Sequence, residues 1–353
     1  MPASRPTFTL TIGALRSTTA DPVGGPTRLL VERDMDVAAD ALRVRLADRS
    51  GVSLGDQVAL ALGEDGGETG VFTGTVAVLR PGLEGVEVLA LGTVGELLNL
   101  RTAAVYEGQS AGDIARDLLG RAGLTAGTVD DGPVLPRYAV DGRLSAYAHV
   151  KGLADRLGFE LYADAQGSGM FHALGPAAGL DSGAGGALSG ALSSASAGAA
   201  GAGGEAYRFG AHLLDVTATR EPAAWGTVDV GGESPMSGQG DRTSHWLTVD
   251  DSDYRGSAGS GDPHLTLLDP AARTKDLADR FAAGRLALAR RTANQVWVSV
   301  LGRPTVDLGA DGSAADVPDA LAGGEGYVRA LRHRFGPDTG FVTDLRFSVG
   351  AGG

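Results

Sequence analysis

The sequence contains no cysteine, and this excludes disulfide bonds, thiolate metal sites and cysteine nucleophiles. Basic side chains are also scarce: 30 Lys and Arg stand against 43 Asp and Glu, for a formal net charge of −13. Nucleic acids and anionic lipid surfaces are bound by clustered Lys and Arg, which release counterions. The charge therefore argues against both kinds of partner.

A long apolar run is missing as well. The N-terminal residues MPASRPTFTLTIG lack the apolar core of a secretory signal, so export by that route is not expected. The uncharged stretch 182–204 contains a G-x-x-x-G motif, but Leu188 and Leu192 are its only large apolar residues. Its transfer into a bilayer would gain too little free energy for a spanning helix, so we expect no membrane insertion by this chain.

Glycine is abundant, with 56 among 353 residues, and short Val- and Leu-rich runs alternate between apolar and polar positions. Such runs predict half-buried antiparallel strands separated by tight turns. In the first part of the chain the alternation is visible at residues 42–46, 58–62, 76–79 and 86–91. The Gly-rich connectors 63–70 and 80–85 supply the positive φ values that hairpins need. We predict a small β domain at about residues 5–104.

The hydrophobic period then changes to that of helices. Ser110, with Asp113 three residues later, predicts a helix start, and Gly123 predicts its end. A second helix is expected to end at Gly158, because one stripe of it is apolar: Tyr147, Val150, Leu153, Ala154 and Leu157. Gly152 inside this helix costs about 1 kcal/mol relative to alanine, which suggests a close backbone contact on its side.

The remainder of the chain predicts more strands and one long helix. Residues 159–162 and 170–174 are expected to form a hairpin, and the Gly-, Ala- and Ser-rich residues 175–204 a flexible linker or long loop. Later strands are expected at residues 212–219, 227–230, 295–301, 327–335 and 341–349. A polar excursion extends to Asp269, and a helix covers about residues 270–291.

Two segments of the chain are similar to each other. Leu-Gly-Asp at residues 54–56 and Leu-Gly-Ala at residues 308–310 are each followed by a strand, a Pro/Gly turn and another alternating strand. We interpret this as a diverged internal duplication of one β unit.

No segment of the sequence carries a complete catalytic motif. Residues 51–55 match G-x-S-x-G, but a nucleophile elbow needs a helix after the serine, and the residues after Ser53 alternate as a strand. The loop from Asp251 to Asp262 partly imitates a calcium loop, yet Arg255 occupies a ligand position and no amphipathic helix flanks it. There is no P-loop and no dinucleotide-binding G-x-G-x-x-G between a strand and a helix.

Metal ligation and acid-base chemistry give no better candidate. None of the histidines has a ligand-like spacing to another: His149, His172, His212, His245, His264 and His333. Any two of the 43 acidic residues could meet in the fold, but nothing singles out a pair. We therefore predict no catalytic, cofactor-binding or metal-binding residue.

The middle of the chain contains the segments YEGQSAGDIARDLLGRAGL at residues 106–124 and LSAYAHVKGLADRLGFELYADAQGSGMFHALGP at residues 144–176. They include the helix start G-x-S-x-x-D-I and a helix exit at Leu153, Ala154, Gly158, Phe159 and Tyr162. With these features the segments resemble the late control protein D family of contractile phage tails. That family is similar in fold to phage baseplate hubs and to the first part of VgrG spike proteins.

The C-terminal part agrees in order with the same family. An alanine-rich helix and a strand are followed by a G-x-P turn at residues 302–309, and the closing strands match at Tyr327, Val328, His333, Phe335, Phe341, Thr343 and Leu345. The resemblance thus covers nearly the whole chain. Because the sequence stops at Gly353, the resemblance implies a spike protein that is separate from this chain.

The resemblance implies an α+β, mainly β fold of two similar small antiparallel β-barrels that form a ring, with an inserted helix-and-hairpin region. The expected domains are a first barrel at 1–104, a helix and hairpin domain at 105–175, a loop at 176–206, a second barrel at 207–232 plus 294–353, and a polar excursion with the long helix at 233–293, which packs with residues 105–175.

The implied function is that of a structural baseplate hub rather than an enzyme, without a cofactor. Three chains would join the hexameric inner tube to the central spike, with an OB-fold or β-helix spike protein and other baseplate proteins as partners. Assembly would occur in the cytoplasm, into a phage tail or tail-like particle. The alternatives are a cell-wall or carbohydrate hydrolase and a β-rich carbohydrate-binding module.

Overall fold

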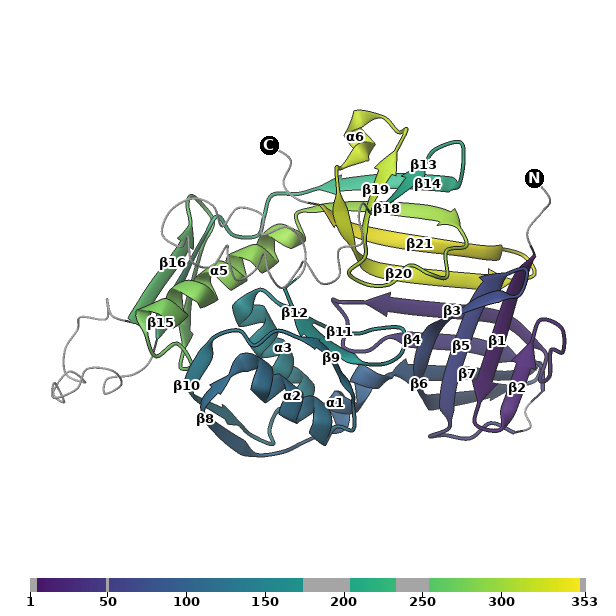
Figure 1. Cartoon of the computed structure of the whole chain (residues 1–353), viewed down its shortest axis with the longest axis horizontal. Coiled ribbons are helices and arrows are strands. Elements are labelled where there is room, and N and C mark those ends of the chain that lie inside the picture. The colour runs from purple at the N-terminus through teal and green to yellow at the C-terminus, as the bar shows by residue number, and fades with distance from the viewer. Residues whose placement is uncertain (1–4, 49–50, 174–203, 233–253, 350–353) are drawn as a thin grey trace.

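The computed structural model describes residues 5–48, 51–173, 204–232 and 254–349, and it is mainly β with helices packed at one side (Figure 1). A 13-stranded sheet runs in the order β14-β18-β21-β20-β3-β4-β7-β6-β5-β1-β2, with β19 on β20 and β13 on β19. Its first seven strands in the chain are β1 (Pro6–Ile12), β2 (Leu15–Thr18), β3 (Pro26–Asp34), β4 (Ala41–Leu46), β5 (Gln57–Glu64), β6 (Gly67–Gly82) and β7 (Gly85–Gly92). The others are β13 (Glu205–Arg208), β14 (Leu213–Arg220), β18 (Asn294–Leu301), β19 (Asp311–Ala315), β20 (Gly326–Gly336) and β21 (Gly340–Val349).

The strands form where the sequence alternates between apolar and polar residues. In β4, Leu42, Val44 and Leu46 are buried, whereas Arg43 and Arg45 between them are exposed. One apolar cluster fills the curve of β1–β7 and a second fills that of β13, β14 and β18–β21. The predicted strands of both regions are therefore confirmed, and the mainly β fold class with them.

The two halves of this sheet repeat one strand order. The first β unit contains β3-β4-β7-β6-β5, the second contains β14-β18-β21-β20-β19, and all neighbours within each are antiparallel. A β-bulge interrupts the first strand of each unit, between Pro26 and Arg28 in β3 and between Leu213 and Asp215 in β14. The fourth strand carries one too, after Val76 in β6 and after Val328 in β20.

The turns that precede the third strand of each unit in chain order, β5 and β19, make the same backbone hydrogen bond. Gly55 donates its N–H to the carbonyl of Val76 at 2.9 Å, and Gly309 donates to Val328 at 2.8 Å. Both glycines have a positive φ, 85° and 82°. The similarity of the two β units, predicted from their Leu-Gly turns, is thereby confirmed.

The two units are joined edge to edge. Residues 330–335 of β20 pair antiparallel with residues 29–34 of β3, with Arg332 opposite Glu32. Because of this joint the units share one curled sheet and are not two separately closed barrels, a difference from the sequence prediction. In the described ranges no pairing connects the two ends of the sheet, β14 and β2.

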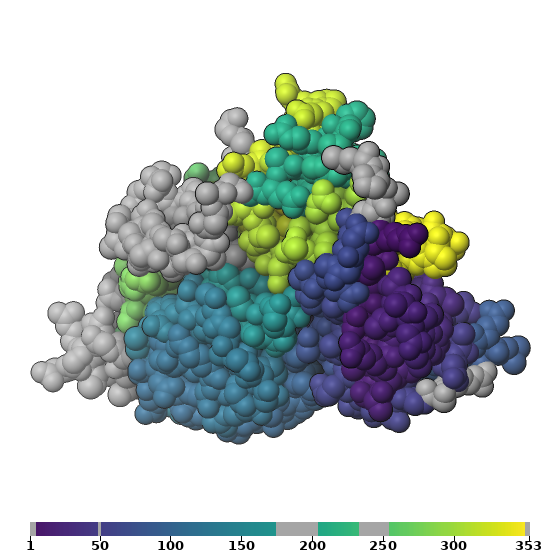
Figure 2. Space-filling model, turned by 45° about the vertical axis from the view of Figure 1, so that its right-hand side comes forward, coloured from purple at the N-terminus to yellow at the C-terminus, as the bar shows by residue number. Residues whose placement is uncertain are grey.

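A helix-hairpin domain follows the first unit, and Figure 2 shows it beside that unit and below the second. It contains η1 (Thr93–Gly95), α1 (Glu96–Asn99), β8 (Ala104–Ser110), α2 (Ala111–Arg121), β9 (Ala126–Val129), β10 (Val134–Val140), α3 (Ala146–Leu157), β11 (Glu160–Ala163) and β12 (Gly169–His172). As predicted, the Ser110 side chain caps α2 by accepting from the Asp113 N–H, and Gly158 ends α3 with a φ of 69°.

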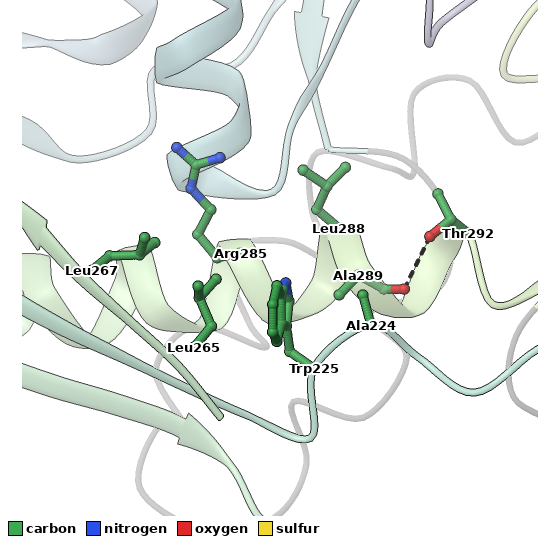
Figure 3. A pocket seen from close by; sticks show the side chains of 8 residues that line it. All are labelled: Ala224, Trp225, Leu265, Leu267, Arg285, Leu288, Ala289 and Thr292. Carbon is green, nitrogen blue, oxygen red and sulfur yellow. Dashed lines mark hydrogen bonds between the residues drawn. The ribbon is translucent and has the colours of Figure 1, made fainter. Parts of the chain in front are cut away.

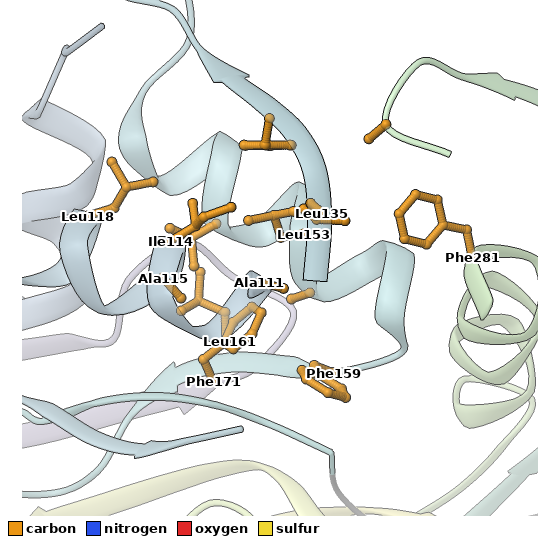
Figure 4. Packing of buried hydrophobic residues seen from close by; sticks show 14 of the residues in the cluster. Ala111, Ile114, Ala115, Leu118, Leu135, Leu153, Phe159, Leu161, Phe171 and Phe281 are labelled. Atoms are coloured by element: carbon orange, nitrogen blue, oxygen red, sulfur yellow. The ribbon is translucent and has the colours of Figure 1, made fainter. Parts of the chain in front are cut away.

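A smaller three-stranded sheet and a long helix complete the fold. They consist of β15 (Thr227–Gly232), β16 (Arg255–Gly259), β17 (His264–Asp269) and α5 (Lys275–Arg291), and a short α6 (Asp319–Ala322) follows. The sequence placed residues 227–232 in the second barrel, but β15 pairs only with β16 and β17 among the described strands. Val228 and Val230 belong instead to the apolar cluster shared by α5 and the helix-hairpin domain. Figure 4 shows part of this cluster, including Phe281 of α5 and Leu153 of α3.

Helices α3 and α5 pack closely, though not where Gly152 predicted. A Cβ on Gly152 would meet only the Arg156 guanidinium. The close approach is at Gly284 in α5, where a Cβ would overlap the Arg156 carbonyl oxygen. The prediction for Gly152 was wrong because a glycine in a helix does not reveal which neighbour it faces.

Candidate functional site

The structure places Ser53 in an exposed turn that leads into strand β5, so the helix of a nucleophile elbow is missing. Its backbone N–H donates to the Asp56 carboxylate at 2.7 Å. Asp251 and His245 lie outside the described residues, and so does nearly all of the predicted 175–204 linker. Within the described part of the chain, no three His, Asp or Glu side chains form a metal-binding group.

A mainly apolar hollow of about 330 Å³ lies between α5 and the small sheet. Figure 3 shows Trp225, Leu265, Arg285 and Leu288 around it, and the Thr292 hydroxyl donates to the Ala289 carbonyl rather than into the hollow. Among the described residues, no carboxylate or imidazole lines it. It therefore offers no acid-base pair for hydrolysis.

A group of paired charges lies where the two β units meet the helix-hairpin domain; Arg33, Asp40, Glu160 and Arg329 are buried, whereas the side chains of Asp36 and Asp307 are 36% and 33% exposed. We call this group the buried ionic junction, and its members come from six elements or loops: Arg33, Asp36, Asp40, Glu160, Arg291, Asp307 and Arg329. Arg33 and Arg329 are among the largest fully buried side chains of the protein. Ions this deep are stable only when paired and hydrogen-bonded.

Arg33 connects three parts of the chain. Its Nε donates to Asp40 at 3.1 Å, and one terminal nitrogen lies 2.6 Å from the Asp307 carboxylate of the second unit. The other terminal nitrogen donates to the Ala163 carbonyl in the β11–β12 hairpin at 2.7 Å. The guanidinium thus joins both β units to the hairpin with every nitrogen engaged.

Arg329 makes the second connection. It contacts Glu160 of β11 at 2.5 Å and Asp36 of the β3–β4 loop at 2.5 Å. Arg291, at the end of α5, reaches the same oxygen of Glu160 and also the Gly158 carbonyl. The helix end and the second β unit therefore meet the hairpin at one buried carboxylate, and Arg329 connects this carboxylate to the first β unit through Asp36.

Burial and pairing act against each other on the acids of the junction. Burial raises the pKa of Asp40 to about 6, although the charge of Arg33 opposes the shift. Burial acts the same way on Asp36, but hydrogen bonds and charge from Arg329 outweigh it and lower its pKa below the usual value. Nearby, burial and then the charge of Arg33 lower the pKa of His333 to about 3.

This arrangement is better suited to holding the two β units and the helix-hairpin domain together than to catalysis. Each carboxylate of the junction contacts an arginine. No junction residue lines the hollow beside α5 or a second, more polar hollow between β14 and α6. The junction was not predicted from the sequence. The signal was present in β3, where Arg33 continues the inward alternation of Leu29 and Val31 and so occupies a position that the pattern reserves for an apolar residue.

In the described ranges no helix is long and apolar enough to cross a membrane. No protein-family model and no curated protein sequence matches this chain.

Solved structures match it over nearly its whole length. A 43 kDa tail protein of a Shewanella oneidensis prophage has 13% identity and a TM-score of 0.67, with 97% of this chain and 98% of that chain covered. A tail protein from Neisseria meningitidis has 13% identity and a TM-score of 0.69, with 97% and 96% covered.

A third similar structure comes from a secretion machine. It is an E. coli component of the type VI secretion system, described as structurally similar to the T4 bacteriophage tail proteins gp27 and gp5. It has 9% identity and a TM-score of 0.57, with 97% of this chain and 77% of that chain covered. Identities this low concern the fold alone. This chain has the fold of phage tail and type VI secretion proteins, and the late control protein D-like resemblance is confirmed at that level.

Proposed function

We propose that this protein is the structural hub of a contractile tail or tail-like particle, and that three chains form the adaptor between a hexameric inner tube and a central spike. The observation that carries the proposal is the repeat of one β unit, with the same strand order, bulges and turn hydrogen bonds, joined edge to edge in one chain. Three such chains present six similar units to the tube and keep threefold symmetry for the spike.

The tail-protein fold supports this role, as does the buried ionic junction, which fixes the units to the helix-hairpin domain. The partners of the hub would be the inner tube protein, a separate OB-fold or β-helix spike protein and other baseplate proteins. The particle would be assembled in the cytoplasm.

The test is the copy number and position of the chain in purified particles. We expect a reconstruction to contain three copies between tube and spike, with first and second β units alternating around one ring. Light scattering should give three times the 35.7 kDa of one chain for the protein alone, and that mass plus the mass of the bound partner for a complex with its tube or spike partner. Any other copy number, or units that do not alternate, would contradict the proposal.

The hydrolase alternative has a separate test. We expect the purified protein to release no soluble fragments from peptidoglycan, and Ser53→Ala particles to assemble and inject normally, because no helix follows Ser53 to form an oxyanion hole. Fragment release, or an assembled but inactive Ser53→Ala particle, would favour the hydrolase.

A further inference from the structure

β6 and β14 each leave a backbone edge of the large sheet without a partner strand among the described strands. β6 spans Gly67–Gly82, but β5 pairs only with its residues 67–75, so that beyond Thr75 it pairs with β7 alone. β14 stands at one end of the sheet and pairs only with β18. Unpaired backbone edges of this kind are templates for a further strand.

The joint inside the chain shows what such a strand would be. β20 occupies in the second unit the place that β6 has in the first, and β3 occupies in the first unit the place of β14 in the second. β20 pairs with β19 at its start and then with β3 through residues 330–335. The later half of a fourth strand thus binds the first strand of the other unit.

We propose that β6 of one chain pairs antiparallel with β14 of a second copy, in the register that β20 and β3 adopt within one chain. The inference rests on the proposed ring. It adds which strands meet there and which residues lie opposite one another. Repeated head to tail, the joint closes the ring with six equivalent steps, three within chains and three between them.

The bulges fix the register of the joint. In β6 and β20, Arg80 and Arg332 occupy the same place, two residues beyond the first residue after the bulge. In β3 and β14, Glu32 and Thr219 occupy the same place, four residues beyond the first residue after the bulge. Because Arg332 lies opposite Glu32, Arg80 lies opposite Thr219 of the second copy.

The side chains at the free edge of β6 are less buried than their equivalents at the joint within the chain, as expected if the partner strand of β6 belongs to another copy. At the joint within the chain, Leu331 and His333 are buried, whereas their equivalents Leu79 and Pro81 are half-buried and exposed. The neighbouring copy would cover the apolar surface that this edge leaves open. Pro81 also removes one N–H donor from the edge, which limits uncontrolled pairing before assembly.

The partner strand shows the same difference. Val31 is buried in β3, while its equivalent Ala218 in β14 is half-buried. Arg33 is buried against Asp307, and its equivalent Arg220 is exposed, with no ion pair within the described residues. Since Ser53 takes the place of Asp307, Arg220 would contact the turn of Ser53 and Asp56 in the next copy.

Cysteine cross-linking tests the register, and the natural chain contributes no cysteine. Arg80→Cys and Thr219→Cys proteins are mixed and oxidised, either where light scattering shows association or in assembled particles. Directly opposite residues on paired strands have Cα atoms about 4.5–5.5 Å apart, which suits a disulfide. We expect covalent dimers on a non-reducing gel, up to about half of the chains when the two variants mix at random in rings of three.

Two controls bracket this result. Glu32→Cys with Arg332→Cys in one chain tests the equivalent pair within the chain and should form an internal disulfide. Arg80→Cys mixed with Arg220→Cys is one residue out of register, with side chains on opposite faces of the sheet, and should give few dimers.

The outcomes separate the joint from the ring. Three associated chains without an 80–219 cross-link, while the 32–332 disulfide forms, would overturn the joint and leave the hub intact. Equal cross-linking at Thr219 and Arg220 would overturn the register. Chains that never associate, even in particles, would overturn both proposals.

Discussion

Arg33 is a charged residue in a position that the strand pattern assigns to the core, and it shows how single residues fasten this fold. Its guanidinium donates hydrogen bonds to Asp40, 7 positions away in the sequence, and to the Ala163 carbonyl, 130 positions away. A buried ion pair adds little net stability compared with apolar residues of the same volume, yet removal of one partner leaves the other charge buried and unpaired.

We expect Arg33→Met to lower the free energy of unfolding by about 3–5 kcal/mol, because Asp40 loses its guanidinium inside the protein. The double variant Arg33→Met with Asp40→Asn should lose less than the single variant. Arg332→Met is the matched control: this arginine faces Glu32 across the β20–β3 joint, but its side chain is 52% exposed. Its loss should stay within about 1 kcal/mol in urea unfolding. Equal losses for Arg33 and Arg332 would contradict the role of the junction.

His333 predicts a pH dependence. Its pKa is lowered to about 3 in the folded protein, whereas the unfolded chain protonates near 6.5, so its contribution is present above 6.5 and declines as pH falls. From pH 7 to pH 5 the loss should be on the order of 2 kcal/mol. Asp40, with its pKa raised to about 6, acts in the opposite direction, since its contribution is lost as pH rises from about 4 to 6.

Comparison with His333→Gln separates the two groups, because Asp40 is common to both proteins. The difference in unfolding free energy between wild type and variant should move in favour of the variant on acidification from pH 7 to pH 5. A difference that is independent of pH would contradict a buried neutral His333.

At the scale of elements, helix α5 depends on a close contact that only glycine permits. The Gly284 Cα lies against the backbone of α3 at its end, near the Arg156 carbonyl and the Gly158 N–H. The C-terminal end of α5 supplies Arg291 to the buried ionic junction. The spacing between α3 and α5 therefore fixes one side of the junction.

Gly284→Ala should destabilise the protein by about 1–3 kcal/mol, because its Cβ would overlap backbone atoms that can move only with the helix. Gly120→Ala is the control, since a Cβ on this exposed helical glycine of α2 would have no neighbouring atom within 4 Å, and alanine there should stabilise by about 0.5–1 kcal/mol. Thermal melts of both variants would show opposite shifts. A stabilising Gly284→Ala would contradict the close helix contact.

At the scale of the whole molecule, the β20–β3 joint and the buried ionic junction make separate unfolding of the two β units unfavourable. We expect one cooperative calorimetric transition, with equal calorimetric and van't Hoff enthalpies, because opening either unit would expose the joint and unpair Arg33 and Arg329. Two resolved transitions in the wild type would show that the units are thermodynamically independent.

The sequence by itself determined the local structure. Alternation located strands such as β4 and β21, and Ser110 and Gly158 marked helix ends, because these features depend on neighbouring residues. The order of motifs also indicated the fold type, and the Leu-Gly turns indicated its repeat.

Only the tertiary structure decided how these elements meet. In the structure β15 belongs to the small sheet and not to the second barrel, the pairing of β3 with β20 joins the two β units, and Arg33 contacts Asp307. Alternation along a strand indicates which face of the strand is buried, but it does not identify the neighbouring strand. A charged residue on the buried face indicates that an ion-pair partner is needed, but not which residue that partner is. Those choices depend on contacts between residues far apart in the chain, and local patterning does not encode them.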